Sequence, residues 1–511
     1  MLTINGVSIQ LKKEGFRLLE NLHVIVNAND KYAIIGHEGT GKSTLLKAIY
    51  NPDLLPYADV FGVCESRGNI GYLEQDIAQV WSGVNVQDFF VKKTPDSEVD
   101  YAMYERLKML PQALERVGFS VNSYDDFKNI DDFSGGEIVK LGIVKLLLQD
   151  TEVFLLDEPS NDLDFETILF LEQFMQEEKR PIVFVSHDER LLENVATGVI
   201  HLQRTEKMTK TKHYIEKMPY LQYKEHRMKV YESSLQVALK QRADYKQKMA
   251  RWRQVYQRVE HQQNQVVRDP SQARLLKKKV KSMQGQLKRF EKEKAAFVDI
   301  PEAEERIDIF FDAAVSLPQG KRVIDIHLPE LKIKDRVLSE NIDLVVVGQS
   351  KVVITGKNGS GKTTLLNALY RKLKDRDDIS VGYMTQHYDS LFEGKTILQF
   401  LQADKDRKKE AWVRKMLGAL GFEREEMTRD TKNLSGGQRA KLYFLKLILD
   451  KNNVLLLDEP TRNLSPLSAP EIHRMLSDFK GCIVCVTHDR VFIERVFDKM
   501  YALTKSGLKE L

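Results

Sequence analysis

Four short motifs each occur twice in this sequence, in the same order and at nearly the same spacing. One motif recurs 320 residues further along, and the other three recur 301 residues further along. Four motifs in register are not a product of chance, so we infer two homologous domains, at 1–204 and 301–511, joined by 205–300. The paired segments are 34–46 and 354–366, 133–137 and 434–438, 153–159 and 454–460, and 185–188 and 486–489.

Each domain is predicted to be an α/β domain with a largely parallel sheet. Apolar runs of strand length alternate with periodic segments of helical length in both copies. The runs 153–156, 182–185, 454–457 and 483–486 are predicted to be buried strands, and the second and fourth lead into a histidine.

The cysteines do not indicate a disulfide framework or a metal site. Only three are present in 511 residues, which favours a reducing cytoplasm. Cys482 and Cys485 lie in a predicted strand, where residues three apart point to opposite faces, so we expect both in the core. No apolar run approaches the ~20 residues that a membrane-spanning helix needs, and the N-terminus shows no secretory signal.

The connecting segment is strongly basic. Residues 205–297 contain 24 Lys and Arg against 9 Asp and Glu, a net charge of +15, whereas the remaining chain has a net charge of −11. Such a concentrated positive field suits a phosphate backbone or an anionic membrane surface. A solvated helical face without a partner is the alternative.

The same segment is predicted to form an antiparallel coiled-coil hairpin with a basic surface. Apolar and aromatic residues advance by threes and fours from Met228 to Val259 and again from Leu276 to Phe297, which indicates two helices. We expect the aromatic residues of these stripes to be core residues rather than nucleobase stackers.

The expected turn centres near residue 266. That register would place Tyr245 opposite Leu287, Arg242 opposite Phe290 and Leu235 opposite Phe297, and a shift by one heptad is the alternative. The predicted tip covers 260–270, where Asp269-Pro270 breaks the helix.

Two glycine-rich segments have the P-loop pattern and its expected context, after an apolar strand and before a helix. Glycines allow backbone N–H groups to surround phosphates, and the helix N-terminus adds its positive dipole end. Lys42 and Lys362 are expected to reach the β- and γ-phosphates, and the Ser43 and Thr363 hydroxyls to bind Mg²⁺. The predicted phosphate-binding residues are Gly36, Gly39, Gly41, Lys42, Ser43 and Thr44, and Gly356, Gly359, Gly361, Lys362, Thr363 and Thr364.

Acidic residues and histidines complete a hydrolytic set in each copy. Asp157 and Asp458 end buried strands, where a carboxylate is costly unless it serves an ion such as Mg²⁺. Glu158 and Glu459 follow and are candidate general bases that polarise the attacking water. The candidate histidines are His187 and His488, whose identical placement in both copies favours a functional role over a core role.

With these motifs in place, both repeats resemble the ATP-binding cassette family over their whole length. The resemblance implies that the signature segment of one domain closes over the nucleotide of the other. Lys42 and Glu158 would then pair with Ser435, Gly436, Gly437 and Gln438, and Lys362 and Glu459 with Ser134, Gly135, Gly136 and Glu137.

The resemblance also implies two glutamine loops and an adenine-stacking aromatic residue. Gln75 and Gln386 would lie near the metal ion and the attacking water, and Phe16 is the candidate platform for adenine in the first copy. Two departures from the family pattern distinguish the copies. Glu137 stands where the signature usually has Gln, and Ser465 stands where an aspartate normally couples the two sites.

Two cassettes joined by a basic helical hairpin look like the ABC-F branch, whose members act on ribosomes. The resemblance implies an ATP hydrolase with two composite sites, a cytoplasmic monomer whose domains pair within the chain. The 70S ribosome (23S rRNA and tRNA) would be its partner through the linker, with no membrane partner. The linker would enter the tRNA exit site and bring its tip near the peptidyl-transferase centre. The tip residues are Val266, Val267 and Arg268.

Segment 461–466 and the C-terminal residues from Tyr501 resemble the Lsa-like ribosome-protection ATPases. Those proteins displace lincosamide, streptogramin A and pleuromutilin antibiotics, so the resemblance implies protection from antibiotics and release on ATP hydrolysis. The short polar tip fits this less well. A housekeeping factor that relieves stalled ribosomes, the motor subunit of a membrane transporter and a coiled-coil DNA-maintenance ATPase are the alternative functions.

Overall fold

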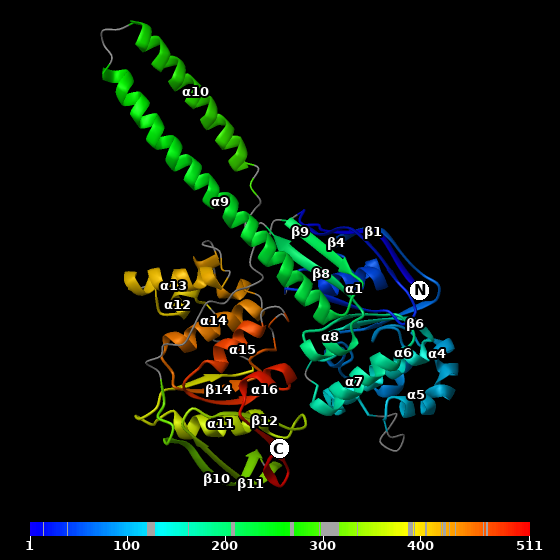
Figure 1. Cartoon of the computed structure of the whole chain (residues 1–511). Coiled ribbons are helices and arrows are strands. Elements are labelled where there is room, and N and C mark those ends of the chain that lie inside the picture. Colours follow the sequence, from blue (N-terminus) through cyan, green and yellow to red (C-terminus); the bar gives the residue numbers. More distant parts are fainter. Residues whose placement is uncertain are drawn as a thin grey trace. The chain divides into compact units, whose positions relative to one another are not determined.

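The chain forms two compact units in a computed structural model (Figure 1). One unit comprises Met1–Tyr220 together with Glu304–Leu511, and the other comprises Leu221–Ala303. The structure describes residues 1–13, 15–37, 39–119, 128–161, 163–205, 210–265, 270–295, 297, 316–334, 336–386, 392, 394–403, 406–420, 422, 426–428, 430–434, 436–462, 464, 466 and 469–511.

The first half of the larger unit contains strands β1 to β9 and helices α1 to α8. The strands are β1 (Leu2–Leu11), β2 (Arg17–Val26), β3 (Lys31–Gly36), β4 (Ala58–Ser66), β5 (Asn69–Leu73), β6 (Thr151–Asp157), β7 (Ile182–Val185), β8 (Gly198–Thr205) and β9 (Lys210–Glu216). The helices are α1 (Lys42–Tyr50), α2 (Ile77–Val80), α3 (Val86–Val91), α4 (Tyr101–Arg106), α5 (Leu110–Arg116), α6 (Gly135–Leu148), α7 (Phe165–Glu177) and α8 (Glu189–Val195). Short 3-10 turns cover Pro52–Leu54, Leu107–Met109 and Ile130–Asp132.

The second half repeats this plan. Its strands are β10 (Arg322–Ile333), β11 (Arg336–Val347), β12 (Lys351–Thr355), β13 (Val381–Met384), β14 (Val454–Asp458), β15 (Cys482–Val486), β16 (Lys499–Thr504) and β17 (Gly507–Glu510). Its helices are α11 (Lys362–Leu373), α12 (Ile397–Phe400), α13 (Arg407–Ala419), α14 (Gly436–Leu449), α15 (Ala469–Ser477) and α16 (Arg490–Val496), with 3-10 turns at Glu426–Thr428 and Thr431–Asn433.

Each half is built on a six-stranded sheet with the same strand order. The orders are β5-β6-β7-β3-β8-β9 and β13-β14-β15-β12-β16-β17, and only the last strand of each runs antiparallel to its neighbour. The α/β fold and its largely parallel sheets are therefore confirmed. The four predicted strands are confirmed as β6, β7, β14 and β15. The carboxyl ends of neighbouring strands thus bring the P-loop, the Asp-Glu pair and the histidine of each half to one edge.

The boundary of the first domain differs from the prediction. Strand β9 pairs with β8 from Val199–Glu216 to Thr205–Lys210, so the sheet continues past residue 204. No motif marks this strand, because an antiparallel edge strand of mixed polarity resembles the basic segment that follows it.

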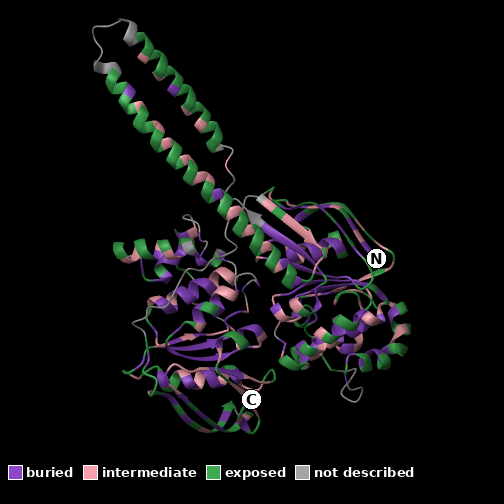
Figure 2. Cartoon of the chain, in the orientation of Figure 1, coloured by how far each residue is buried: buried purple, intermediate pink, exposed green. Residues whose placement is uncertain are grey.

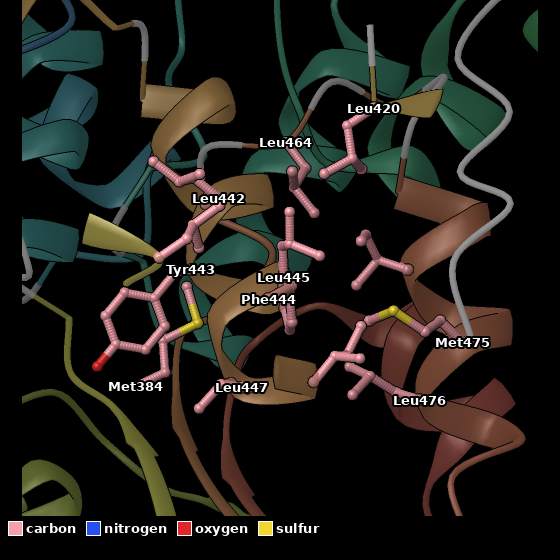
Figure 3. Close-up of a cluster of buried hydrophobic side chains, with 14 of the residues drawn as sticks. Met384, Leu420, Leu442, Tyr443, Phe444, Leu445, Leu447, Leu464, Met475 and Leu476 are labelled. Carbon is pink, nitrogen blue, oxygen red and sulfur yellow. The ribbon is translucent and has the colours of Figure 1, made fainter. Parts of the chain in front are cut away.

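Apolar side chains fill both faces of the sheets. In the second half, α14 and α15 pack with Met384, Leu464 and their neighbours into one cluster (Figure 3). A second cluster joins β10, β11 and α11 to the other face. Cys485 belongs to the first cluster and Cys482 to the second, so the predicted core placement of both cysteines on opposite faces is confirmed.

The smaller unit is a hairpin of two long helices, α9 (Tyr220–Gln265) and α10 (Pro270–Ala295). Most of its residues are exposed, and the less exposed ones follow the predicted stripe, including Ala238, Val259 and Met283 (Figure 2). Met228, predicted as the first stripe position, is 60% exposed, so that part of the prediction is wrong. The helical hairpin itself is confirmed.

The predicted register of the hairpin is wrong. The ring of Tyr245 contacts that of Phe297 at 5.4 Å, and the guanidinium of Arg242 lies 5.9 Å from the same ring. Trp252 Nε1 donates to the carbonyl oxygen of Met283, and Lys248 pairs with Glu293. These contacts favour the alternative register, shifted by about one heptad.

The predicted tip residues Val266, Val267 and Arg268 lie outside the described residues. Within the described part of the chain, no helix is both long enough and apolar enough to span a membrane.

Candidate nucleotide-binding site

The loops that follow β3 and β12 have the same backbone conformation. Their glycines have φ values of 148°, 71° and 96° in the first half and 145°, 73° and 98° in the second, at Gly36, Gly39, Gly41, Gly356, Gly359 and Gly361. A Cβ atom on Gly36 would lie 2.3 Å from the carbonyl oxygen of Leu202, so only glycine fits. Each loop leads into a helix N-terminus, which is suited to binding a phosphate group.

The P-loop lysines turn back over their own loops in the same way. Lys42 Nζ donates to the carbonyl oxygens of Gly36 and His37 at 3.0 and 3.2 Å. Lys362 Nζ donates to those of Gly356 and Lys357 at 2.7 and 3.0 Å. Burial lowers the pKa of Lys362. Each ammonium group therefore lies at its loop, within reach of a bound triphosphate.

Ser43 and Asp157 form an oxygen-rich pair at the start of α1. Ser43 Oγ donates to Asp157 Oδ1 at 2.9 Å, and the Tyr72 hydroxyl donates to Asp157 Oδ2 at 2.9 Å. Asp157 is only 1% exposed, and this burial raises the pKa of its carboxyl group. Hydroxyl and carboxylate oxygens are the ligands that Mg²⁺ prefers, so these residues fit the ion, which would neutralise phosphate charge.

Glu158 is held in a strained conformation beside His187. Its φ is 50°, in the left-handed region, and its N–H donates to the carbonyl oxygen of Val185 at 3.0 Å. Glu158 Oε1 lies 2.9 Å from His187 Nε2. Burial acts to raise the pKa of Glu158, but the nearby His187 and Lys42 hold it below its ordinary value. The carboxylate is thus kept ionised, as a general base requires.

Glu459 has the same backbone but different surroundings. Its φ is 48°, and its N–H donates to the carbonyl oxygen of Val486 at 2.9 Å. The distance from Glu459 Oε1 to His488 Nε2 is 3.9 Å, and among the described residues neither ring nitrogen of His488 has a hydrogen-bond partner. Burial, helped by the Asp458 carboxylate, raises the pKa of Glu459 to about 8. Burial lowers the pKa of His488 to about 4.

The difference extends to the loops after the glutamates. His187 Nδ1 lies 3.0 Å from the carbonyl oxygen of Leu464, which belongs to the second half. His187 is therefore held on both sides, by Glu158 through one ring nitrogen and by the opposite half through the other.

A cavity of about 420 Å³ adjoins the second P-loop. Its walls include Lys362, Glu459 and His488 from the second half and Ser160, Asn161 and His187 from the first. Gly359, Gly361, Thr363, Thr364, Gln386 and Asp458 also line it. The structure thus brings the predicted residues of the second site together around a space of the size that small-molecule ligands occupy.

The first signature segment is not among the residues that line this cavity. Ser134 caps α6: it accepts from the N–H of Glu137 at 3.4 Å, while Glu137 Oε2 accepts from the Ser134 N–H and hydroxyl at 2.8 and 2.7 Å. Gly135 is exposed and Gly136 buried at the start of this helix. The pairing of each signature with the opposite P-loop stays a prediction.

The other predicted residues are dispersed. Gln75 follows β5 and is exposed, and Thr44 is half-buried in α1. Gly436 and Gly437 begin α14, and Gln438 Nε2 donates to Glu426 Oε1 at 3.3 Å. Ser435 and Ser465 lie outside the described residues. Phe16 is half-buried and packs against the core of the first half.

Three contacts of the site were missed from the sequence. Tyr72 binds Asp157, Leu464 contacts His187, and Arg490 Nη1 lies 2.8 Å from Glu172 Oε2 across the two halves. Of these residues, only Tyr72 could have been found from the sequence, because Tyr383 occupies the same place in the second Gly-Tyr segment.

Comparison with known proteins gives consistent results. The family model described as "ABC transporter" matches residues 19–161 and 339–462. The chain is 26% identical over 532 residues to "Probable ATP-binding protein YheS" of Escherichia coli (strain K12), covering 97% of this chain and 77% of that protein. It is 25% identical over 539 residues to "Ribosome protection protein VmlR" of Bacillus subtilis (strain 168), covering 100% and 88%.

Among solved structures, the fold resembles a chain in the crystal structure of archaeal ribosomal stalk protein aP1 with archaeal ribosome recycling factor aABCE1. The TM-score is 0.55 at 18% identity, and the match covers 99% of this chain and 90% of that one. The family model matches just over half of the residues, once in each half and across each P-loop and Asp-Glu pair. The chain therefore belongs to the ABC transporter family and carries two copies of its ATP-binding domain.

Proposed function

We propose that this chain is an ATP-dependent ribosome-binding factor of the ABC-F branch, with the hairpin α9–α10 as its ribosome-contacting part. The observation that carries the proposal is the charge of this unit. Residues 221–295 contain 20 Lys and Arg against 7 Asp and Glu. Its basic side chains include Arg251, Arg253 and the exposed run Lys277–Lys279. A stiff basic rod suits RNA, which proteins recognise largely through its backbone and shape.

The relatives support a ribosomal partner. One of them is named a ribosome protection protein, and its match covers the whole of this chain, including the hairpin. On this proposal the hairpin enters the tRNA exit site of the 70S ribosome, contacts 23S rRNA and tRNA, and brings residues 266–268 near the peptidyl-transferase centre.

ATP hydrolysis would set how long the chain stays bound. In each proposed site the P-loop lysine binds the phosphates, and Ser43 with Asp157, or Thr363 with Asp458, holds Mg²⁺ with Gln75 or Gln386. Glu158 and Glu459 polarise the attacking water, and His187 and His488 orient it. The signature segments 134–137 and 435–438 would complete the sites from the opposite half. Binding of ATP closes the two halves, and hydrolysis releases the chain.

Protection from antibiotics is the finer part of the proposal. A hairpin tip near the peptidyl-transferase centre would displace drugs bound there, such as lincosamides, streptogramin A and pleuromutilins. Expression in a susceptible host should raise the inhibitory concentrations of these drugs, and deletion of residues 264–270 should abolish the effect. Ribosome binding without any change in these concentrations would instead favour relief of stalled ribosomes.

The first test is co-sedimentation of a Glu158→Gln/Glu459→Gln variant with 70S ribosomes, with and without ATP. Loss of both general bases should trap the ATP-bound state, so we expect pelleting with ATP and little without it. A trapped protein that stays in the supernatant at low and moderate salt would refute ribosome binding.

A further inference from the structure

Each P-loop packs against the second strand of a β-hairpin, β2 in the first half and β11 in the second. A Cβ atom on Gly41 would lie 3.5 Å from Leu18 Cδ1, and one on Gly361 would lie 2.9 Å from Leu338 Cδ1. These glycines and leucines are each 320 residues apart, as are Asn21 and Asn341, which have φ values of 56° and 51°. The two strands therefore correspond residue for residue beside the phosphate-binding loops.

The hairpin turns next to this position differ. In the first half, Gln10 pairs with Arg17, and the Leu11 N–H at the end of β1 donates to the carbonyl oxygen of Phe16, the residue just before β2, at 2.8 Å. In the second half, Ile333 pairs with Arg336, so only residues 334–335 lie between the strands. The residue that corresponds to Phe16 is Arg336, the first residue of β11. The second half thus has no aromatic side chain at this position.

An aliphatic pair lies at the second P-loop instead. Ile333 and Leu338 line the same cavity as Lys362, Thr363 and Glu459. Ile333 pairs with Arg336, and Leu338 lies two residues further along β11. The side chains of Ile333 and Leu338 therefore point to the same face of the hairpin, the face toward the P-loop. Ile333 is 49% exposed, so its apolar surface is available to a bound molecule.

We propose that Ile333 and Leu338 form the nucleobase-contacting wall of the second ATP site, and that this site discriminates between bases less than the first. The proposal rests on the proposed function, because it assumes that both P-loops bind a nucleoside triphosphate. It assigns base recognition to Phe16 in the first site and to aliphatic contact in the second.

The consequence follows from the chemistry of the two surfaces. An aromatic ring stacks on a base face to face, and a purine offers more stacking surface than a pyrimidine. An aliphatic wall contacts any base through non-directional burial. The first site should therefore prefer ATP over CTP, and the second should bind both with similar affinity through their shared triphosphate.

Single-site variants separate the two sites. Equilibrium dialysis with Mg-ATP and Mg-CTP would be measured on Lys42→Ala, which leaves the second site, and on Lys362→Ala, which leaves the first. We expect the first site to prefer ATP by roughly tenfold or more, and the second site by less than about threefold. Phe16→Leu in the Lys362→Ala background should lower the preference to that of the second site.

The wall itself is tested in the Lys42→Ala background. Ile333→Ala should weaken ATP and CTP binding by the same factor, and Ile333→Tyr should create a preference for ATP. Val337→Ala is the matched control, because Val337 is 40% exposed on the opposite face of β11 and should leave both affinities unchanged. Circular dichroism would verify that each variant is folded.

Equal base preference at the two sites would overturn the proposal, as would a larger loss of ATP binding from Arg336→Ala than from Ile333→Ala. Failure of both single-lysine variants and of the unmodified chain to bind any triphosphate would refute the proposed function instead.

Discussion

His187 Nε2 lies 2.9 Å from Glu158 Oε1 in the first ATPase half. The corresponding atoms of His488 and Glu459 are 3.9 Å apart, although the two glutamates have nearly the same backbone conformation. His187 Nδ1 also lies 3.0 Å from the carbonyl oxygen of Leu464 in the opposite half. Two copies of one motif have therefore produced one glutamate that its histidine holds at hydrogen-bond distance and one that its histidine does not.

This difference predicts unequal effects of the two glutamates. Glu158→Gln should lower kcat for ATP by roughly 10²–10⁴-fold, the usual contribution of a positioned general base. Glu459→Gln should lower kcat by a smaller factor, because His488 does not hold Glu459 at hydrogen-bond distance. Steady-state phosphate release from the two single variants is the measurement, and an equal or larger loss from Glu459→Gln would contradict the account.

Glu137 predicts a weaker second site. Its carboxylate accepts hydrogen bonds from the Ser134 N–H and hydroxyl, so this hydroxyl is already engaged. If segment 134–137 pairs with the Lys362 site as proposed, Glu137 would also place a negative charge next to the triphosphate there. Glu137→Gln should therefore raise the affinity of Lys42→Ala protein for ATP several-fold. The reverse exchange, Gln438→Glu, should weaken ATP binding in Lys362→Ala protein. Titration with a fluorescent ATP analogue measures both, and unchanged affinities would refute the role of this charge.

Lys145 predicts a pH dependence of stability. Its ammonium lies 3.7 Å from the ring centre of Trp81 and 4.5 Å from that of Phe89, and burial lowers its pKa to about 7. An unfolded lysine has a pKa of about 10.4, so from about pH 7 to 10 the unfolded chain binds a proton that the folded chain lacks. The contribution of Lys145 to the free energy of unfolding therefore increases as the pH rises through this range.

Lys145→Met removes that gain. The melting temperature of the variant relative to the unmodified chain should be highest near pH 7 and should fall toward pH 10. Lys446→Met is the matched control, because Lys446 is the counterpart of Lys145 and forms an ion pair with Asp450 at 2.9 Å. Its difference from the unmodified chain should not follow this trend. Thermal unfolding between pH 6.5 and 9.5 measures both, and a difference for Lys145→Met that is constant with pH would contradict the prediction.

The register of the hairpin predicts which aromatic residues are coupled. A double-mutant cycle of Tyr245→Ala and Phe297→Ala should give a coupling free energy of about 0.5–1.5 kcal/mol, since the two rings meet edge to face. The cycle of Tyr245→Ala and Leu287→Ala should give none. Chemical unfolding followed by circular dichroism supplies the free energies, and the opposite outcome would restore the register expected from the sequence.

The repeated motifs were sufficient to predict the fold, because a P-loop and an Asp-Glu pair occur only at the carboxyl ends of strands and thus determine the strand pattern around them. Short-range chemistry was also predictable: Ser134-x-x-Glu137 is a capping-box pattern, and the structure shows both of its hydrogen bonds. Distances that depend on segments far apart in the sequence could not be predicted. The separations of Glu158 and Glu459 from their histidines depend on Leu464 and on side-chain packing, which the motif does not specify.

Turn geometry limited the remaining predictions. The hairpin stripe was visible from its period, but its register depended on where α9 ends and α10 begins, which a polar turn does not specify. Likewise, no counterpart of Phe16 could be assigned from the sequence, because the β10–β11 turn is shorter than the β1–β2 turn and this becomes apparent only once the strands are paired.

On the proposed function, the basic hairpin binds the ribosome when both ATP sites are occupied. The most direct measurement is the affinity of Glu158→Gln/Glu459→Gln protein for 70S ribosomes in ATP, compared with the same protein carrying Lys277→Gln, Lys278→Gln and Lys279→Gln. These lysines are exposed in α10, so their exchange should leave the fold and ATP binding intact. We expect the triple variant to bind at least about tenfold more weakly, with a salt dependence shallower by about 2 in log–log slope. Equal affinity and equal salt dependence would refute the proposal, because ribosome binding would then not involve the charge of the hairpin.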